Sequence, residues 1–345
     1  MSVHGETASR AVPPHVQLIQ MGTAAWVNAV VFAAAKIGLA DQLAAGPKNA
    51  AELAGSMRLH APSLHRLMRT LASLGILTER DAQRFALTPM GEALKTGAPG
   101  SARATVIAFG GAFWHGWEEI VYSLETGNTG FDKAHGMPLF EYLRQHPAEA
   151  SDFSEAMVGF HGEEPPAIAQ AYDFSGFKNI VDVGGATGNL LAAILSKHPG
   201  PRGVLFDMAH VVADAPPLLK SHGVEDRVTI EAGSFFETVP AGGDCYLLSH
   251  IIHDWSEDRC LTILGHCRKA MKPDGRLLIV EMVLPAGDTP HPGKVLDMVM
   301  LVFPGGQERT EAEYRRLFDA AGFRLSRIIP IRGGIDVIEG EPLPQ

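Results

Sequence analysis

The two halves of the chain differ in how their apolar residues are spaced. Residues 13–96 are rich in Ala and Leu, and the segment 61–75 places its apolar positions at helical spacing. From about residue 176, short apolar or β-branched runs alternate with helical stretches; the runs are NIVDVGG, RGVLFDM, VTIEAG, DCYLLSH and GRLLIVEMV. Five such strands with helices between them predict an open, mostly parallel α/β sheet.

The N-terminal half predicts a different architecture. A helix at 51–57, a turn, a second helix from 61 that ends at Gly75, and the hairpin ILTERDAQRFALT are typical of a winged-helix arrangement. The segment 18–45 is dense in Ala and predicts a helix that is apolar nearly all round, so we expect a partner subunit to cover it. Residues 100–170 are typical of further helices, and GEEPP at 162–166 predicts a helix start rather than an acid/base pair.

These changes in pattern predict three segments. Residues 1–100 form a helical, winged-helix-like domain, 101–170 form a helical connector that contributes to a substrate pocket, and 171–345 form the α/β domain. A length of 345 residues agrees with more than one core.

The net charge of the chain argues against nucleic acid as its partner. The formal net charge is −10, whereas a dedicated nucleic-acid binder normally has a basic balance. Between Lys48 and Lys95, seven Lys and Arg residues stand against four Asp and Glu residues, which is only a mild excess. A winged-helix regulator that senses a ligand is therefore kept as a minor alternative.

Other features favour a cytoplasmic protein. Cys245, Cys260 and Cys267 are odd in number and form no CxxC pair, which is typical of a reducing compartment. The N-terminus shows no basic stretch followed by an apolar run, so no signal peptide is expected. The apolar segment 24–40 is interrupted by Asn28 and Lys36 and is short for a bilayer span, so no membrane is expected as a partner.

A glycine-rich turn follows the first predicted strand, within NIVDVGGATGNLLAAILSKHP (179–199). A P-loop would need Lys-Ser or Lys-Thr after its last glycine, and a dinucleotide fingerprint would need a different glycine register. Asp207 ends the next strand, just over twenty residues beyond Gly184, where a carboxylate accepts hydrogen bonds from ribose hydroxyls. Two acid-bearing strands around a glycine turn predict a site for S-adenosylmethionine.

From Val181 onward the chain resembles the metal-independent small-molecule O-methyltransferases, which include plant caffeate and flavonoid enzymes and bacterial antibiotic-tailoring enzymes. The segments that carry the resemblance are VDVGGATG, FDMAHVVADAP, HDWSEDRC, IVEMVLP, DMVMLVFPGGQERT and EYRRLFDAAGF. The N-terminal segment is similar to the dimerisation domain of the family. The resemblance implies a Rossmann-like class I methyltransferase sheet, a mainly helical dimerisation domain, a homodimer and S-adenosylmethionine as methyl donor.

Cofactor contacts follow from the resemblance at matching positions. It implies Gly184 at the methionine end, Asp207 on the ribose, and Ser234 and Phe235 near the adenine. Ser249 stands where the family often has Lys or Arg, and Asp254 is implied either near the cofactor or holding its turn. Ala186 replaces the third glycine of the motif, a small change that we expect the turn to tolerate.

The resemblance also implies the catalytic group: His253 as general base, with Glu281 and Glu308 flanking and orienting it. A histidine suits this task because its ordinary pKa of about 6.5 lets it take a phenolic proton near neutral pH. The alternative is a metal site with His250, but residues three apart on a strand point to opposite faces and no further ligand has the required spacing. We therefore predict no metal, with His250 packed or near the adenine edge.

Apolar side chains are expected to select the acceptor. Family positions imply Trp117, Met157, Phe160, Met300 and Phe303, although such residues at helical spacing also form ordinary cores. Their character predicts a hydroxylated aromatic or polyketide-like small molecule. Some relatives use the same scaffold for hydroxylation or decarboxylation, and this alternative is less favoured because His253 and both glutamates are retained.

Overall fold

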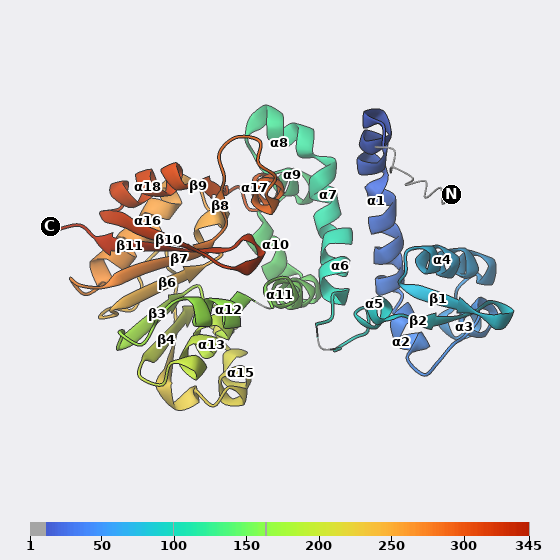
Figure 1. The fold of residues 1–345 in the computed structure, drawn as a ribbon, viewed down its shortest axis with the longest axis horizontal. Coiled ribbons are helices and arrows are strands. Elements are labelled where there is room, and N and C mark those ends of the chain that lie inside the picture. Colours follow the sequence, from blue (N-terminus) through green and yellow to red (C-terminus); the bar gives the residue numbers. More distant parts are fainter. Residues whose placement is uncertain (1–11, 99, 163, 345) are drawn as a thin grey trace, which may run out of the picture. The chain divides into compact units, whose positions relative to one another are not determined.

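The computed structural model describes residues 12–98, 100–162 and 164–344, and it divides into two compact units (Figure 1). The helical unit comprises the chain up to Trp114 together with His146–Phe160. The sheet unit comprises His115–Gln145 and the chain from His161 onward. Two helices, α7 (Ala112–Glu118) and α11 (Pro147–His161), each contain a boundary between the units.

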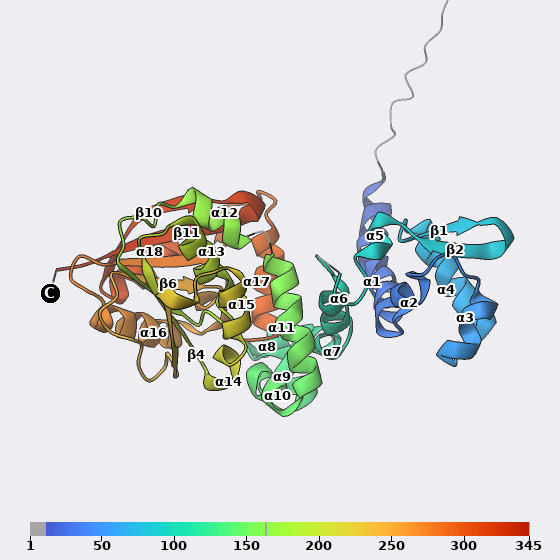
Figure 2. The same cartoon turned by 90° about the horizontal axis from the view of Figure 1, so that it is seen from below.

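The helical unit contains the predicted helix, turn, helix and hairpin. Asn49 caps α3, because its side chain and that of Glu52 form a reciprocal capping box. The hairpin strands pair antiparallel from Leu77↔Leu87 to Arg80↔Arg84 and lie beside α4 (Figure 2). The remaining elements of this unit are α1 (Pro14–Lys36), α2 (Leu39–Leu43), α3 (Ala50–Met57), α4 (Ala61–Ser73), β1 (Leu77–Arg80), β2 (Arg84–Leu87), α5 (Pro89–Glu92) and α6 (Arg103–Gly110).

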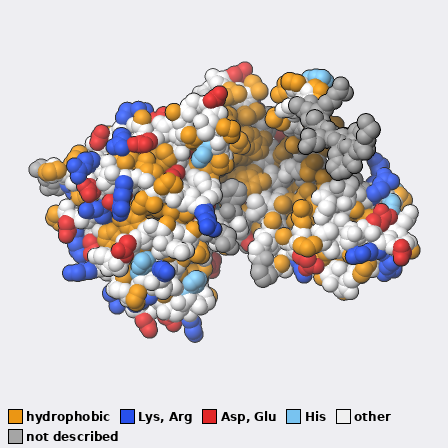
Figure 3. All heavy atoms as spheres, in the orientation of Figure 1, with side chains coloured by type: hydrophobic (Ala, Val, Ile, Leu, Met, Phe, Trp, Pro, Cys, Tyr) orange, Lys and Arg blue, Asp and Glu red, His pale blue; other side chains and the backbone are white. Residues whose placement is uncertain are grey.

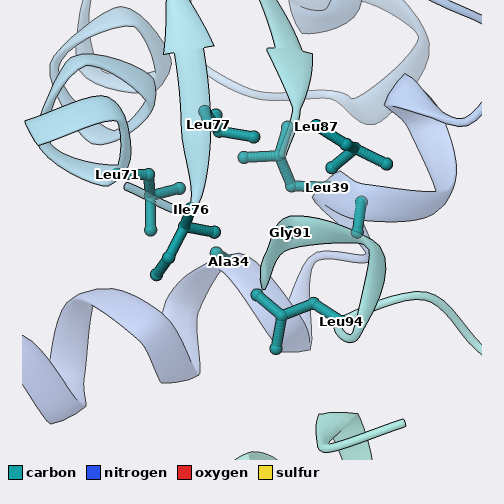
Figure 4. Close-up of a pocket in the computed structure, with 9 residues that line it drawn as sticks. Ala34, Leu39, Leu71, Ile76, Leu77, Leu87, Gly91 and Leu94 are labelled. Carbon is teal, nitrogen blue, oxygen red and sulfur yellow. The ribbon is translucent and has the colours of Figure 1, made fainter. Parts of the chain in front are cut away.

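Aliphatic side chains from α1, α4 and the hairpin converge in the core of the helical unit (Figure 4). The space left between them is about 10 Å³, which is at most one water molecule. A space of this size is too small for a small-molecule ligand.

Helix α1 starts and ends earlier than the predicted helix over 18–45, whose last part forms the separate helix α2. It begins at Pro14, a residue suited to a first helical turn, and runs for 23 residues. Only Ala34 and Ala35 are buried along it. By length and composition alone it is apolar enough to cross a membrane, a test that a core helix of a soluble protein or a signal sequence also passes. Its exposed apolar side chains are Leu18, Ile19, Met21, Trp26 and Val27.

The sheet unit is built on a seven-stranded mixed sheet with the order β10-β11-β7-β6-β3-β4-β5. The five predicted strands are present and parallel: β3 (Asn179–Val183), β4 (Arg202–Asp207), β5 (Val228–Ala232), β6 (Cys245–Ser249) and β7 (Arg276–Glu281). The sequence did not lead us to predict β10 (Phe323–Pro330) and β11 (Asp336–Pro342), which pair antiparallel at the edge beside β7.

Alternating side chains of the central strands pack on two faces. In β7, Leu278 and Val280 join the core under α12 (Glu164–Ala171), α13 (Asn189–Lys197) and α15 (Ala215–Ser221). Leu277 and Ile279 join the core under α16 (Glu257–Ala270) and α18 (Glu311–Ala320) on the opposite face (Figure 1). Strands buried on both sides need continuous apolar sequences, and this is why they were recognisable.

Short elements complete the sheet unit. They are α8 (Ile120–Thr126), α9 (Gly130–His135), α10 (Leu139–Gln145), α14 (Ala209–Val212), α17 (Pro292–Val302), β8 (Val283–Leu284) and β9 (Arg309–Thr310). A single turn of 3₁₀ helix, Ile252–Asp254, follows β6. It carries the histidine around which the candidate site is built.

Candidate active site

The predicted site residues of the sheet unit gather where its parallel strands end. Gly184 follows β3, Asp207 ends β4, Ser249 ends β6 and Glu281 ends β7. Parallel strands bring their carboxyl ends to one edge, where open α/β sheets bind their ligands. Residues almost a hundred positions apart in sequence are therefore neighbours in the fold.

The glycine turn after β3 is shaped for close approach of a ligand. Gly184 has a φ of +73°, and a Cβ there would overlap Cδ1 of Ile251. Its N–H donates to the carbonyl of Phe206, 2.8 Å away, which ties the turn to β4. Asp207 stands beside this turn with a half-buried carboxylate. The turn exposes backbone to the amino-acid part of S-adenosylmethionine, and the carboxylate of Asp207 suits its ribose hydroxyls. The residues therefore fit this cofactor.

Ala186 is a more constrained position than its small size indicates. Its φ is +50°, in the left-handed region that glycine adopts freely and other residues rarely enter. Its N–H donates to Oδ2 of Asp207 at 3.0 Å, while Oδ1 of the same carboxylate accepts from the N–H of Met208 at 2.6 Å. The Asp207 carboxylate therefore stabilises the turn, and the hydrogen bonds of the turn fix the orientation of the carboxylate.

The other predicted cofactor residues lie around this edge. The ring of Phe235 would be 3.4 Å from a Cβ at Gly184, so it borders the glycine turn. Ser234 uses its hydroxyl in the local backbone, where it accepts from the N–H of Phe236 at 3.3 Å. Ser249 is half-buried at the last position of β6. Oδ1 of Asp254 lies 3.7 Å from Nε2 of His253.

His253 is held by two carboxylates in different ways. Its Nδ1 lies 2.6 Å from Oε1 of Glu308, so this nitrogen carries a proton and Nε2 is left for an acceptor. Glu281 does not contact the imidazole ring, although Glu281 and Glu308 were both predicted to flank it. Its Oε1 accepts the backbone N–H of His253 at 3.0 Å, and its Oε2 accepts from the hydroxyl of Tyr314. Glu308 thus orients the imidazole, and Glu281 fixes the backbone that carries it.

A buried arginine supports the turn that carries His253. Arg309 is 1 % exposed, and its guanidinium donates to the carbonyls of Ile252 at 3.2 Å and Trp255 at 3.4 Å. The thiol of Cys260 donates to the carbonyl of Ile252 at 3.2 Å, which gives this cysteine a supporting position. Neither Arg309 nor Tyr314 was singled out in the sequence, because their partners are backbone groups and acids far along the chain.

The electrostatics of the site favour a charged imidazole. Burial opposes the charge on His253, but the hydrogen bond to Glu308 and the negative charges of Asp254, Glu281 and Glu308 outweigh it, and the pKa of His253 is raised to about 10. Burial raises the pKa of Asp254 to about 6 and also raises the pKa of Glu308. A cation bound beside the ring would lower the pKa of His253, because like charges disfavour the protonated form.

The predicted acceptor residues fall in both units. Trp117 packs edge-on against Phe303, with ring centroids 5.4 Å apart, and Met300 lies one turn earlier on α17. Phe303 and Met300 are buried, at 2 % and 7 % exposed. Met157 and Phe160 belong to the part of α11 in the helical unit. The acceptor roles of all five residues stay predictions.

His250 departs from the predicted strand geometry. The strand ends at Ser249, and His250 has a φ of +54°, so the alternation of side chains stops before it. The rings of His250 and His253 are consequently 5.4 Å apart, and the prediction that they point to opposite faces was wrong. Nε2 of His250 lies 2.8 Å from Oε2 of Glu164, the first residue of α12. GEEPP does begin a helix, as predicted. Its second acid, Glu164, also lies within hydrogen-bond distance of His161 and His250.

Two family models match this chain. Residues 19–97 match an O-methyltransferase dimerisation domain, and residues 114–324 match an O-methyltransferase domain. Together they extend over most of the chain and over both units.

Proteins of known activity are similar along nearly the full length. A phenazine O-methyltransferase of Lysobacter antibioticus is 43% identical over 96% of this chain and 98% of its own. An 8-amino-8-demethylriboflavin N,N-dimethyltransferase of Streptomyces davaonensis is 36% identical, over 90% of each chain. The crystal structure of an O-methyltransferase from neocarzinostatin biosynthesis, in complex with S-adenosyl-L-homocysteine and 1,4-dihydroxy-2-naphthoic acid, has a TM-score of 0.81 and 32% identity, and covers 92% of this chain and 96% of that one. The chain belongs to the O-methyltransferase family with an N-terminal dimerisation domain, and it is an S-adenosylmethionine-dependent methyltransferase.

Proposed function

We propose that this enzyme methylates a hydroxyl group of an aromatic or polyketide-like small molecule, with His253 as general base. The observation that carries the proposal is the buried pair of His253 and Glu308, in which Nδ1 is held by the carboxylate and Nε2 is left to take a proton once the positive charge of the bound donor has lowered the raised pKa of the ring. An aromatic hydroxyl has an ordinary pKa of about 10 and is a weak nucleophile until it loses its proton. An aromatic amine does not need this step to the same degree, so the pair favours oxygen as the acceptor.

The chain's own residues have three tasks in the reaction. S-adenosylmethionine, when bound, supplies the methyl group from a positively charged sulfonium; Gly184 and Asp207 are the residues that would hold it. His253 takes the proton of the acceptor hydroxyl on Nε2, and Glu308 stabilises the imidazolium that results. Glu281 and Arg309 keep the His253 backbone in place, since a small misplacement of reacting groups is costly.

Labelled methyl donor tests this proposal directly. The enzyme is incubated with S-adenosylmethionine labelled in its methyl group and a panel of phenols, hydroxynaphthoates and hydroxyphenazines, with the corresponding aromatic amines in parallel. We expect label on oxygen for at least one hydroxylated acceptor. Transfer only to amine nitrogen, or no transfer to any acceptor by protein that binds the donor, would reject the proposal in favour of N-methylation or another reaction on this scaffold.

Two rivals have less support. A hydroxylating or decarboxylating relative would have no need of the His253–Glu308 pair, which is intact here. A ligand-sensing DNA-binding regulator would need a basic surface. The winged-helix segment between Lys48 and Lys95 has only a mild basic excess, and on the face shown in Figure 3 basic and acidic side chains are also mixed over the sheet unit. Absence of DNA binding at low salt, where such binding is strongest, would end the regulator hypothesis.

We further infer a cytoplasmic homodimer. The matched dimerisation domain contains all but Leu18 of the exposed apolar side chains named above for α1, whose cover by a second chain would remove them from water. A homodimer would also explain why most of a helix of this length and hydropathy is left uncovered by its own unit.

The pKa of His253 can be moved by its carboxylate partner. With Glu308 in place we expect the ring to titrate well above 6.5, so the base form is lost as pH falls through this raised pKa. Glu308→Gln removes the hydrogen-bonded charge and should lower the pKa of His253 by about one unit or more. Imidazole titration by NMR measures this shift, with His253→Ala to assign the signal.

The exposed Glu257, in the first turn of α16, provides the control. Glu257→Gln should leave the His253 signal unchanged. Equal titration of His253 in the wild type and in Glu308→Gln would show that Glu308 does not tune this base.

A further inference from the structure

A second cluster of ligating side chains lies beside the proposed base, and the roles proposed above for methyl transfer do not use it. It consists of His161 at the end of α11, Glu164 at the start of α12 and His250 just after β6. One carboxylate oxygen joins them: Oε2 of Glu164 lies 3.1 Å from Nδ1 of His161 and 2.8 Å from Nε2 of His250. Elements that are far apart in the sequence, with 86 positions between Glu164 and His250, thus place two imidazoles and a carboxylate together.

The spacing of the three donor atoms is that of adjacent metal ligands. All three lie within 4.8 Å of one another, and within the described ranges no other group of three His, Cys, Asp or Glu side chains does so. Metal–ligand bonds of about 2.0–2.1 Å place neighbouring donors roughly 2.9–3.4 Å apart in octahedral or tetrahedral geometry. The two nitrogen–oxygen distances are close to this range, so small adjustments would seat an ion between them.

Two of the three side chains are also in the right chemical state. Burial lowers the pKa of His250 to about 4, so its imidazole is neutral at physiological pH. Burial favours the neutral form of Glu164, but the hydrogen bonds from His161 and His250 outweigh it and lower the pKa to about 2, so this group is a carboxylate. Metals bind neutral imidazole and ionised carboxylate, so the states of His250 and Glu164 suit a metal ion.

Access and backbone geometry support the same conclusion. The three side chains are 22%, 18% and 14% exposed, so an ion can reach them from solvent while most of their surface is buried. His250 keeps a left-handed backbone that costs energy for a residue other than glycine, and this conformation turns its ring toward Glu164. The Nδ1 atom of His250 is buried without a hydrogen-bond partner among the described residues, so the ring is held by the cluster through Nε2 alone.

We propose that His161, Glu164 and His250 form a binding site for a divalent transition-metal ion, of the kind that prefers imidazole and carboxylate ligands, such as Zn²⁺ or Co²⁺. Three protein ligands leave at least one coordination position for water or another small ligand. The bound ion would link α12 to the end of β6. This inference does not depend on which acceptor the enzyme methylates.

Titration of the full-length, metal-free protein with Co²⁺ tests the proposal. We expect one ion per chain, with visible absorption bands that report nitrogen and oxygen ligands, and displacement of the ion by Zn²⁺. Glu164→Gln, a substitution of equal shape, should weaken the affinity at least ten-fold. Zn²⁺ should raise the Tm of the wild type and not that of Glu164→Gln, because an ion that binds only the folded state stabilises it.

The chain offers a matched control. His115 and Glu118 have the same spacing in sequence and lie 2.9 Å apart, but both are 59% exposed and they belong to no three-residue group among the described side chains. Glu118→Gln should therefore leave the affinity for Co²⁺ within about two-fold of the wild-type value.

A second variant keeps the test valid if Glu164→Gln fails to fold. His250→Asn removes the imidazole while keeping a residue that tolerates a left-handed backbone, and circular dichroism checks that it folds. It should weaken Co²⁺ binding at least ten-fold, as Glu164→Gln does. No absorption bands up to about 1 mM Co²⁺, or the same affinity in the wild type, Glu164→Gln and His250→Asn, would overturn the proposed site.

Discussion

His253→Ala should lower kcat about 10²-fold or more at neutral pH with an acceptor of ordinary phenolic pKa, because the proton of the hydroxyl then has no base to receive it. Binding of S-adenosylmethionine should change little, since the residues that fit it are Gly184 and Asp207 on other strands. Initial rates at saturating donor, together with donor affinity by calorimetry, measure the two effects separately.

The variant protein must also be shown to be folded. Removing a buried imidazole leaves a cavity and frees the carboxylate of Glu308, so a fall in Tm is expected as well. A variant that is folded, binds the donor and keeps wild-type turnover would mean that positioning alone carries the reaction and that His253 is a structural residue.

Gly306→Ala should be among the most damaging single-methyl additions in the sheet unit. A Cβ at Gly306 would overlap the carbonyl oxygen of His253 and lie 2.5 Å from the carbonyl carbon of Asp254 and 2.7 Å from the nitrogen of Trp255. All three atoms are backbone, so no side chain can rotate away. The neighbouring Gln307 N–H donates to the same His253 carbonyl at 2.8 Å, which binds the loop to the turn.

The extra methyl group must push the loop away from the turn, and with it Glu308 from His253. We expect a loss of about 3 kcal/mol in the free energy of unfolding and a fall in kcat of at least ten-fold. Gly265→Ala is the control, because Gly265 lies within α16 with nothing within 4 Å of its missing Cβ. It should keep activity and gain about 1 kcal/mol from better helix propensity. Equal Tm and kcat for both variants would contradict this close packing.

Much of the sheet unit could be predicted because buried parallel strands have a strong sequence pattern. Their carboxyl ends also predicted where Gly184, Asp207 and Glu281 would meet. The edge strands β10 and β11 were not recognised, since β10 alternates exposed and buried residues irregularly and is interrupted by a bulge between Leu325 and Arg327.

The parts of the site that escaped prediction depend on the path of the backbone rather than on residue type. His250 was assigned to the wrong face because a strand period was continued past Ser249, where the backbone becomes left-handed. Glu164 was interpreted only as a helix start, and its contact with His250 arises 86 residues away. Ala186 was judged by its size, whereas its positive φ decides its conformation. Such contacts have no local pattern in the sequence.

The central claim is that His253 removes the proton of the acceptor, and acceptors of different acidity test it most directly. The rates of the wild type and of His253→Ala are compared at one pH near 8 with two ring-matched acceptors, one of pKa about 10 and one made acidic by substitution, of pKa about 7. We predict a loss of 10²–10⁴-fold for the first and of less than about ten-fold for the second, whose hydroxyl is already ionised in water. The same loss for both acceptors would contradict the assignment of His253 as the base.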